Sequence, residues 1–146
     1  MISIQELLEM RGLDLSKKVK LVRHLDSRYN VHSIYQNGQL NTYQSYQENK
    51  VFECDYIVSF LGIEDMKASF IGVFKVEGKK DPNNVPLPED FLYNGNFKDS
   101  TVFYQLKEVP GFNDFKDRVI IDWGSSRQWH QWSKNLKEVI EIIPDK

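Results

Sequence analysis

The sequence lacks most of the patterns that mark catalytic, metal-binding or membrane-spanning proteins. Cys54 is its single cysteine, so the chain forms no internal disulfide and no cysteine-rich zinc site. The three histidines are scattered, which gives no support to a metal centre. No glycine-rich phosphate loop occurs, and no apolar run reaches the length of a membrane span. We therefore expect no metal or other cofactor, no membrane partner and no catalytic centre of its own.

An excess of positive charge is also missing. The chain has 19 basic and 21 acidic residues, which gives a net charge of −2. A protein that holds nucleic acid by bulk charge is basic, so a nucleic-acid site here has to be a local patch. The candidates are lysines that otherwise only keep a surface soluble: Lys17, Lys18, Lys20, Lys79 and Lys80. The first residues show no basic segment followed by an apolar one, so we expect no signal peptide and a cytoplasmic location.

The residues that are present predict one domain spanning 1–146, with 40% hydrophobic residues available for its core. Ser3-Ile4-Gln5-Glu6 matches a capping box, and Gly12 fits the end of the short helix that would follow. Further helices are expected at about residues 30–36 and 39–50.

Runs of β-branched and aromatic residues predict strands at 19–24, 55–61, 68–76, 101–106, 118–123 and 139–143. Glycine, proline and asparagine gather in 78–97, which indicates a long loop. Helices and strands do not alternate as they do in a parallel sheet. The pattern favours the α+β class, as a small curved antiparallel β-sheet or barrel with flanking N-terminal helices.

The segment 122–132 is the most unusual part of the chain, because it holds all three tryptophans. Indoles stack on flat rings, a guanidinium matches a phosphate or a base edge, and a glutamine pairs both a donor and an acceptor with a base. These are the parts that hold an extruded base, and here they are Trp123, Ser125, Arg127, Trp129 and Gln131. The alternative is structural: Trp129 and Trp132 would share one face of a helix and cover the core.

Two further clusters carry groups of the same kind. Arg23 and His24 end the first predicted strand, where they would touch phosphate or lie in a solvated loop. Tyr43, Tyr46 and Gln47 share one face if their segment is helical, and would line the pocket or pack against the sheet.

Two other classes of function remain open at this point. A protein- or small-molecule-binding module would use the tryptophan-rich segment as its interface. An enzyme would use Cys54 as a nucleophile with His130 as its base, although a lone cysteine at a strand entrance usually packs as a small apolar residue.

Several stretches of the chain resemble known families. Asp55-Tyr56-Ile57-Val58-Ser59-Phe60, together with the run 70–76, resembles the central strand pair of PUA-like domains, the superfamily that includes the EVE, YTH and ASCH branches. Three stretches taken together resemble the N-terminal domain of bacterial proteins that carry a C-terminal GIY-YIG nuclease: Val22-Arg23-His24 with Asp26 and Arg28, residues 43–47, and Ile121-Asp122-Trp123-Gly124 with Arg127, Trp129, His130 and Gln131.

This resemblance implies a PUA-like recognition domain that takes a modified or flipped-out base into an aromatic pocket. It implies nucleic acid as the partner, DNA in preference to RNA, and a fused nuclease in a restriction or phage-defence system. The base-binding residues it implies are Arg23, His24, Tyr43, Gln47, Trp123, Ser125, Arg127, Trp129 and Gln131. Neither a Gly-Ile-Tyr nor a Tyr-Ile-Gly tripeptide occurs, so cleavage is not expected from this chain itself.

Overall fold

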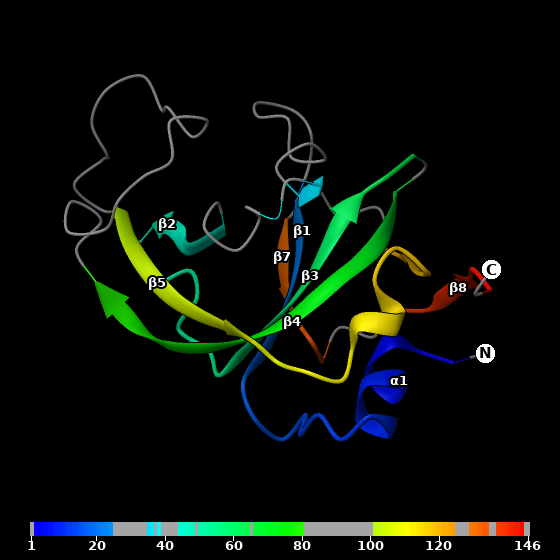
Figure 1. Cartoon of the computed structure of the whole chain (residues 1–146), viewed down its shortest axis with the longest axis horizontal. Coiled ribbons are helices and arrows are strands. Elements are labelled where there is room, and N and C mark those ends of the chain that lie inside the picture. The colour runs from blue at the N-terminus through cyan, green and yellow to red at the C-terminus, as the bar shows by residue number, and fades with distance from the viewer. Residues whose placement is uncertain are drawn as a thin grey trace.

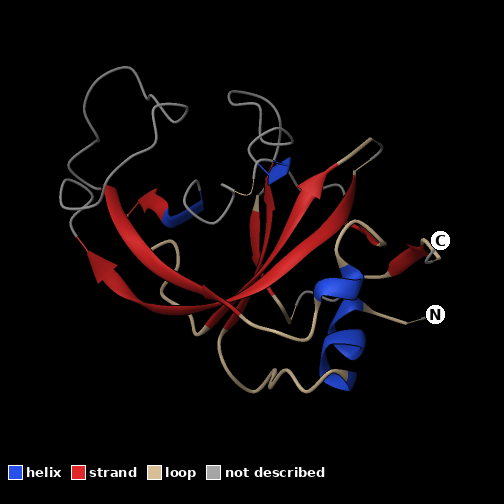
Figure 2. Cartoon of the chain, in the orientation of Figure 1, coloured by secondary structure: helices blue, strands red, loops and turns tan. Residues whose placement is uncertain are grey.

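A computed structural model of the chain shows a strongly curled β-sheet with one short α-helix beside it (Figures 1 and 2). The residues that it describes are 2–24, 35–36, 38, 44–48, 50–64, 66–80, 101–124, 129–134 and 137–144. Their elements are α1 (Ile4–Met10), β1 (Val19–His24), β2 (Tyr46–Glu48), β3 (Tyr56–Gly62), β4 (Lys67–Lys80), β5 (Thr101–Glu108), the 3-10 helix η3 (Asn113–Phe115), β6 (Val119–Asp122), β7 (His130–Trp132) and β8 (Val139–Ile142).

Helix α1 begins and ends as the sequence predicts. The Ser3 hydroxyl accepts the Glu6 backbone N–H at 3.2 Å, which caps the first turn. At the other end Gly12 has a φ of +91°, a backbone conformation that glycine adopts without strain. The N–H groups of Gly12 and Leu13 bond to the carbonyls of Glu9 and Leu8, which is the Schellman arrangement.

The predicted strands at 19–24, 55–61, 68–76, 101–106, 118–123 and 139–143 are confirmed within one or two residues, apart from β4 and β5, which extend further. The sheet order is β2-β5-β4-β3-β1-β7, and β6 joins β4 to β8. Every described strand pair is antiparallel except β1 with β3, which is parallel. The expectation of a purely antiparallel sheet is therefore wrong. The long connection 25–55 gives the chain room to return in the same direction.

Two other expectations about local structure are corrected. Residues 46–48 form strand β2, paired with β5, although a helix was expected over 39–50; only Gln44 and Ser45 are helical among the described residues there. Residues 130–132 form strand β7 on the edge of β1, so Trp129 and Trp132 do not lie on a helix. Of the helix expected at 30–36, only its last two residues are described, and both are helical.

Strand β4 bends the sheet, because its register shifts between Ser59 and Phe60 of β3 and again between Val76 and Gly78. The two faces of the curled sheet carry separate cores. The larger core lies between the sheet, α1 and η3 and includes Leu8, Leu21, Phe60, Phe70 and Trp123. The smaller core lies on the other face and holds Val22, Phe52, Ile57, Phe74, Tyr104 and Leu106.

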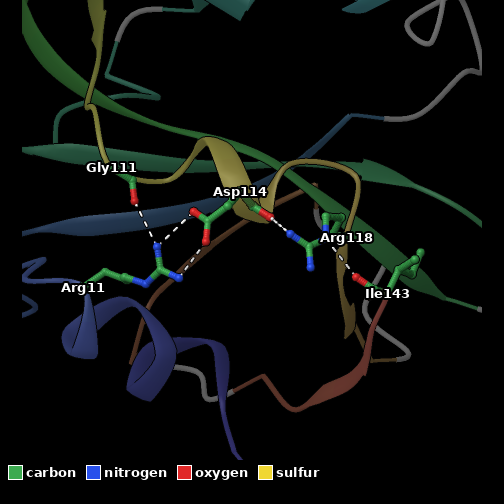
Figure 3. A network of polar contacts seen from close by, with 5 residues as sticks. All are labelled: Arg11, Gly111, Asp114, Arg118 and Ile143. Carbon is green, nitrogen blue, oxygen red and sulfur yellow. Dashed lines mark hydrogen bonds and ion pairs between the residues drawn. The ribbon is translucent and has the colours of Figure 1, made fainter. Parts of the chain in front are cut away.

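A polar network closes the end of the larger core (Figure 3). The Arg11 guanidinium of α1 donates to both carboxylate oxygens of Asp114 in η3, at 2.9 and 2.7 Å. Arg118 donates to the carbonyls of Asp114 and Ile143, which fastens the end of β8 to the same place. In the part of the chain that is described, no helix is long and apolar enough to cross a membrane.

Candidate nucleic-acid interface

A basic pocket of about 500 Å³ opens where β1 begins and β7 ends. Its polar lining comes from the turn before β1, from β1 itself, from the turn at residues 50–53 and from the residues after β7. The residues that line it are Leu15, Lys17, Lys18, Val19, Lys20, Lys50, Glu53, Trp132, Ser133 and Lys134. Five lysines thus face one glutamate on a chain whose net charge is −2.

Most of these lysines have no ion-pair partner among the described residues. The side chains of Lys17, Lys18, Lys50 and Lys134 are exposed, and none of them forms an ion pair with any residue that the structure describes. The Glu53 carboxylate forms an ion pair with Lys79, with 3.2 Å between Oε1 and Nζ, and Lys79 is not one of the lysines that line the pocket. The pocket therefore carries a local positive potential that would attract an anion.

Trp132 forms a wall of the basic pocket and is 39% exposed. The register Lys20↔Trp132 sets the two residues opposite each other on β1 and β7, so their side chains share a face. The Lys20 ammonium lies 4.9 Å from the centroid of the Trp132 ring. An exposed indole beside cations is the combination that stacks on a base and contacts its phosphate.

Lys20 differs from the other lysines because it is held in place. It is only 7% exposed, its ammonium donates to the Val51 carbonyl, and it lies 3.5 Å from Nδ1 of His130. Burial lowers the pKa of Lys20 and that of His130, and the nearby ammonium lowers the His130 pKa further. His130 is therefore neutral at pH 7, and it positions Lys20 without adding charge.

The described residues that were predicted to hold a base do not line the basic pocket. Trp123 has no exposed surface, because its indole packs edge-on against Phe60 in the larger core. Trp123 is therefore part of the core and does not form an open wall on which a base could stack. Arg23 and Gln131 are also buried, at 5% and 7% exposure, on the same side of the β1–β7 pair as Trp123.

His24 has a hydrogen-bonding role inside the protein. Its Nε2 lies 3.0 Å from Oε1 of Gln44, and Oε1 also accepts the Ser59 hydroxyl at 2.7 Å. An amide oxygen only accepts, so Nε2 carries the proton. Burial lowers the pKa of His24 to about 4, hence the ring is neutral at pH 7 and is not an exposed cation for phosphate. Gln47 joins the same cluster, since its amide donates to the Gln44 carbonyl at 3.0 Å.

Trp129 is half-buried and packs against Phe52, with ring centroids 6.3 Å apart. Its strand neighbour Trp132 is the indole that stays open, a role that the sequence reasoning did not favour. Tyr43, Ser125 and Arg127 lie outside the described residues. The sequence reasoning also missed Lys50 and Lys134, because each is a single lysine in a turn and only the fold brings it beside Lys17 and Lys18.

Cys54 and His130 do not make a reactive pair in the described arrangement. Burial raises the pKa of the Cys54 thiol to about 11, so the thiolate needed for nucleophilic attack is scarce at neutral pH. His130 contacts Lys20 instead. No three histidine, cysteine, aspartate or glutamate side chains among the described residues come together in a group that could hold a metal ion.

No protein-family model, no characterised protein and no solved structure matches the chain significantly.

Proposed function

We propose that this chain is a nucleic-acid recognition module that binds through the basic pocket. The observation that carries the proposal is the cluster of four exposed lysines, without ion pairs among the described residues, around the open indole of Trp132. Phosphates supply the anions that such lysines attract, and an unstacked base supplies the flat ring for the indole. The ligand is therefore a single-stranded segment or a base displaced from a duplex.

The size of the pocket supports this choice of ligand. A volume of about 500 Å³ lies within the roughly 300–1,000 Å³ that is usual for sites that enclose a small molecule, so it suits one nucleotide unit better than an extended duplex. Lysines and an indole line the same pocket, so backbone contact and base contact would be made by different side chains.

The family resemblance extends the proposal to a specific target. Readers of the PUA-like superfamily take one base into a pocket, and a curled sheet with a small core is compatible with that class. We accordingly propose a modified or flipped-out base in DNA as the ligand, and a nuclease domain of the GIY-YIG type as the functional partner. In this proposal the chain selects the site and the partner cuts.

The experiment measures binding of labelled oligonucleotides by fluorescence anisotropy, with single-stranded, duplex and modified-base duplex DNA. The variant Lys17→Glu/Lys18→Glu places repulsive charge at the pocket, and we expect it to weaken binding by at least about tenfold at low salt. The side chains of both lysines are exposed, so the variant should fold normally.

The matched control is Lys75→Glu/Lys107→Glu, which makes the same change in net charge elsewhere. These two exposed lysines face each other across β4 and β5, and neither lines the pocket. Equal weakening in both double variants would show that only total charge matters, and would overturn the proposal. The absence of binding by the wild-type protein to all three DNAs would also overturn it and would favour a protein-binding role for Trp132.

A further inference from the structure

Three hydrogen-bond donor side chains meet around Trp123 on the face of the β1–β7 pair opposite the basic pocket. The register Leu21↔Gln131 places Gln131 on the same face as Leu21, and Arg23 follows two residues later on that face. The two long side chains are therefore diagonal neighbours within reach of each other. The guanidinium carbon of Arg23 and the ammonium of Lys137 lie 5.2 and 5.3 Å from the Trp123 ring centroid.

Two of these donors are buried without an acceptor. Nε of Arg23 and Nε2 of Gln131 have almost no accessible surface and no hydrogen-bond partner among the described residues. Both groups donate only, so what they lack is an acceptor. A buried donor left unsatisfied costs about 1–3 kcal/mol, and more when it is charged. Two such donors on neighbouring strands therefore indicate a ligand rather than chance.

The charges at this place are also unbalanced. Arg23 and Lys137 form no ion pair with any described carboxylate, and the Lys137 ammonium instead donates to the Trp123 carbonyl at 2.6 Å. Burial lowers the pKa of Lys137, the nearby Asp122 carboxylate raises it, and Arg23 lowers it by a smaller amount. Asp122, whose Oδ1 accepts the Gly124 N–H, thus offsets part of the charge, and two cations remain against one carboxylate.

Gly124 lies beside the Lys137 ammonium. This residue is half-exposed, and a Cβ at this position would lie 3.6 Å from the ammonium, which is an ordinary contact distance. Its φ of +87° is the feature that favours glycine here. The ammonium therefore lies next to a half-exposed residue.

We propose that Arg23, Gln131 and Lys137 form a binding site for a phosphate monoester or inorganic phosphate, separate from the basic pocket. A guanidinium and an amide offer several directed N–H groups to tetrahedral oxygens. Two cations match the charge of about −2 that such a phosphate carries at neutral pH. Trp123 packs in the core beside the two cations and does not stack on the ligand.

The test observes the Arg23 Nε–H and the Gln131 side-chain amide directly by proton–nitrogen NMR of the wild-type protein. Inorganic phosphate is titrated at constant ionic strength against chloride, and Arg23→Lys assigns the guanidinium signal. We expect both signals to shift together along one saturable curve. Signals that do not move with phosphate, or that move equally with chloride, would overturn the proposal and assign the missing partner to water.

Two oligonucleotides identify the source of the phosphate. A short single strand with a 5′-terminal phosphate and the same strand without it are compared with inorganic phosphate. Shifts with inorganic phosphate and with neither strand assign a free phosphate, whereas shifts that need the terminal phosphate assign a nucleic-acid end; both support the site. The variant Lys17→Glu/Lys18→Glu should retain the response to inorganic phosphate, so this proposal and that of the basic pocket fail or succeed separately.

Gln131→Met provides a second test, because it keeps the shape of the side chain and removes its donor. We expect the affinity for inorganic phosphate to fall about tenfold, the usual effect of losing one hydrogen bond to a charged group. Gln105→Met, an exposed position on β5, is the matched control and should bind phosphate as the wild type does. Equal affinity of Gln131→Met and the wild type would contradict the assignment of Gln131 to the site.

Discussion

Trp123 and Trp132 lie on opposite sides of the β1–β7 pair, and each has a cation close to its ring. Arg23 and Lys137 lie within 5.3 Å of the Trp123 centroid, and Lys20 lies 4.9 Å from that of Trp132. Trp123 is 0% exposed, whereas Trp132 is 39% exposed. The same pair of residue types thus makes a core element on one side and an exposed pocket lining on the other.

The difference shows that exposure, not residue type, decides which aromatic ring can meet a ligand. Trp123 is surrounded by Phe60 and other members of the larger core, so its contribution is to stability. Trp132 lies on the edge strand β7 and lines the basic pocket, so the contribution that we propose for it is to binding. Substitutions that separate stability from binding therefore test the comparison directly.

The largest effect is expected from Trp123→Ala. Removing a fully buried indole leaves a cavity in the larger core, so we expect the free energy of unfolding to fall by about 3–5 kcal/mol. Trp132→Ala should lower it by about 1 kcal/mol or less, because that side chain is partly exposed. Urea unfolding followed by circular dichroism measures both values. Similar losses for the two variants would break the comparison.

The buried His24 on the side of Trp132 should make stability depend on pH. Its pKa is about 4 in the folded protein and about 6.5 when unfolded, so the unfolded state binds more protons between these values. Stability is then present at pH 7 and falls as the pH drops from about 6.5 to about 4, by about 3 kcal/mol in total.

Unfolding in urea at a series of pH values measures this loss. His24→Gln retains a side-chain donor for Gln44 and removes the titrating group, so its stability should change much less over the same range. A wild-type curve that follows the His24→Gln curve would show that His24 is not buried as described.

Loss of the open indole should affect binding and not folding. On the proposed function, Trp132→Ala weakens binding of a single-stranded oligonucleotide by about 1–3 kcal/mol, the usual value of one stacked base. Trp132→Phe retains an aromatic face and should recover most of the affinity. Fluorescence anisotropy measures the three affinities. An unchanged affinity in Trp132→Ala would remove this residue from the interface.

The smallest effect is expected at the surface network of Figure 3. Asp114→Asn weakens an ion pair with Arg11 whose side chains are 39% and 50% exposed, so solvent already screens most of the attraction. We expect a slight fall in thermal stability that disappears at high salt. Glu64→Gln is the control, because Glu64 is exposed and forms no ion pair with any described residue. A fall that persists at high salt would indicate that α1 depends on this contact more than its exposure implies.

The extent to which the sequence predicted the fold follows from the range of each interaction. The Ser3 cap and the Gly12 terminus depend on residues within one turn, so both were predicted and are confirmed. Strand β2 was predicted as helix, because its polar residues become a strand only through pairing of Tyr46 with Phe103 of β5. Strand β7 was missed for the same reason, since His130 to Trp132 pair with β1 far back in the chain.

The residues of the candidate site also divide into those that the sequence predicted and those that it did not. The candidates predicted for a local positive patch were Lys17, Lys18, Lys20, Lys79 and Lys80. The first three line the basic pocket, whereas Lys79 and Lys80 do not, and Lys79 pairs with Glu53. Lys50 and Lys134 could not be predicted, since only the folded chain brings these distant turns together. The choice among the tryptophans was also beyond the sequence, because composition does not report which indole is covered.

The sequence by itself determined which short segments extend as strands, where α1 begins and ends, and which residue types are available to bind an anion or a flat ring. Those properties depend on neighbours along the chain. Only the tertiary structure decided that β1 runs parallel to β3, that Trp123 is sealed while Trp132 is open, and that five lysines share one pocket. Pairing and burial join residues that are far apart in sequence, so they become defined only when the sheet curls and its two cores form.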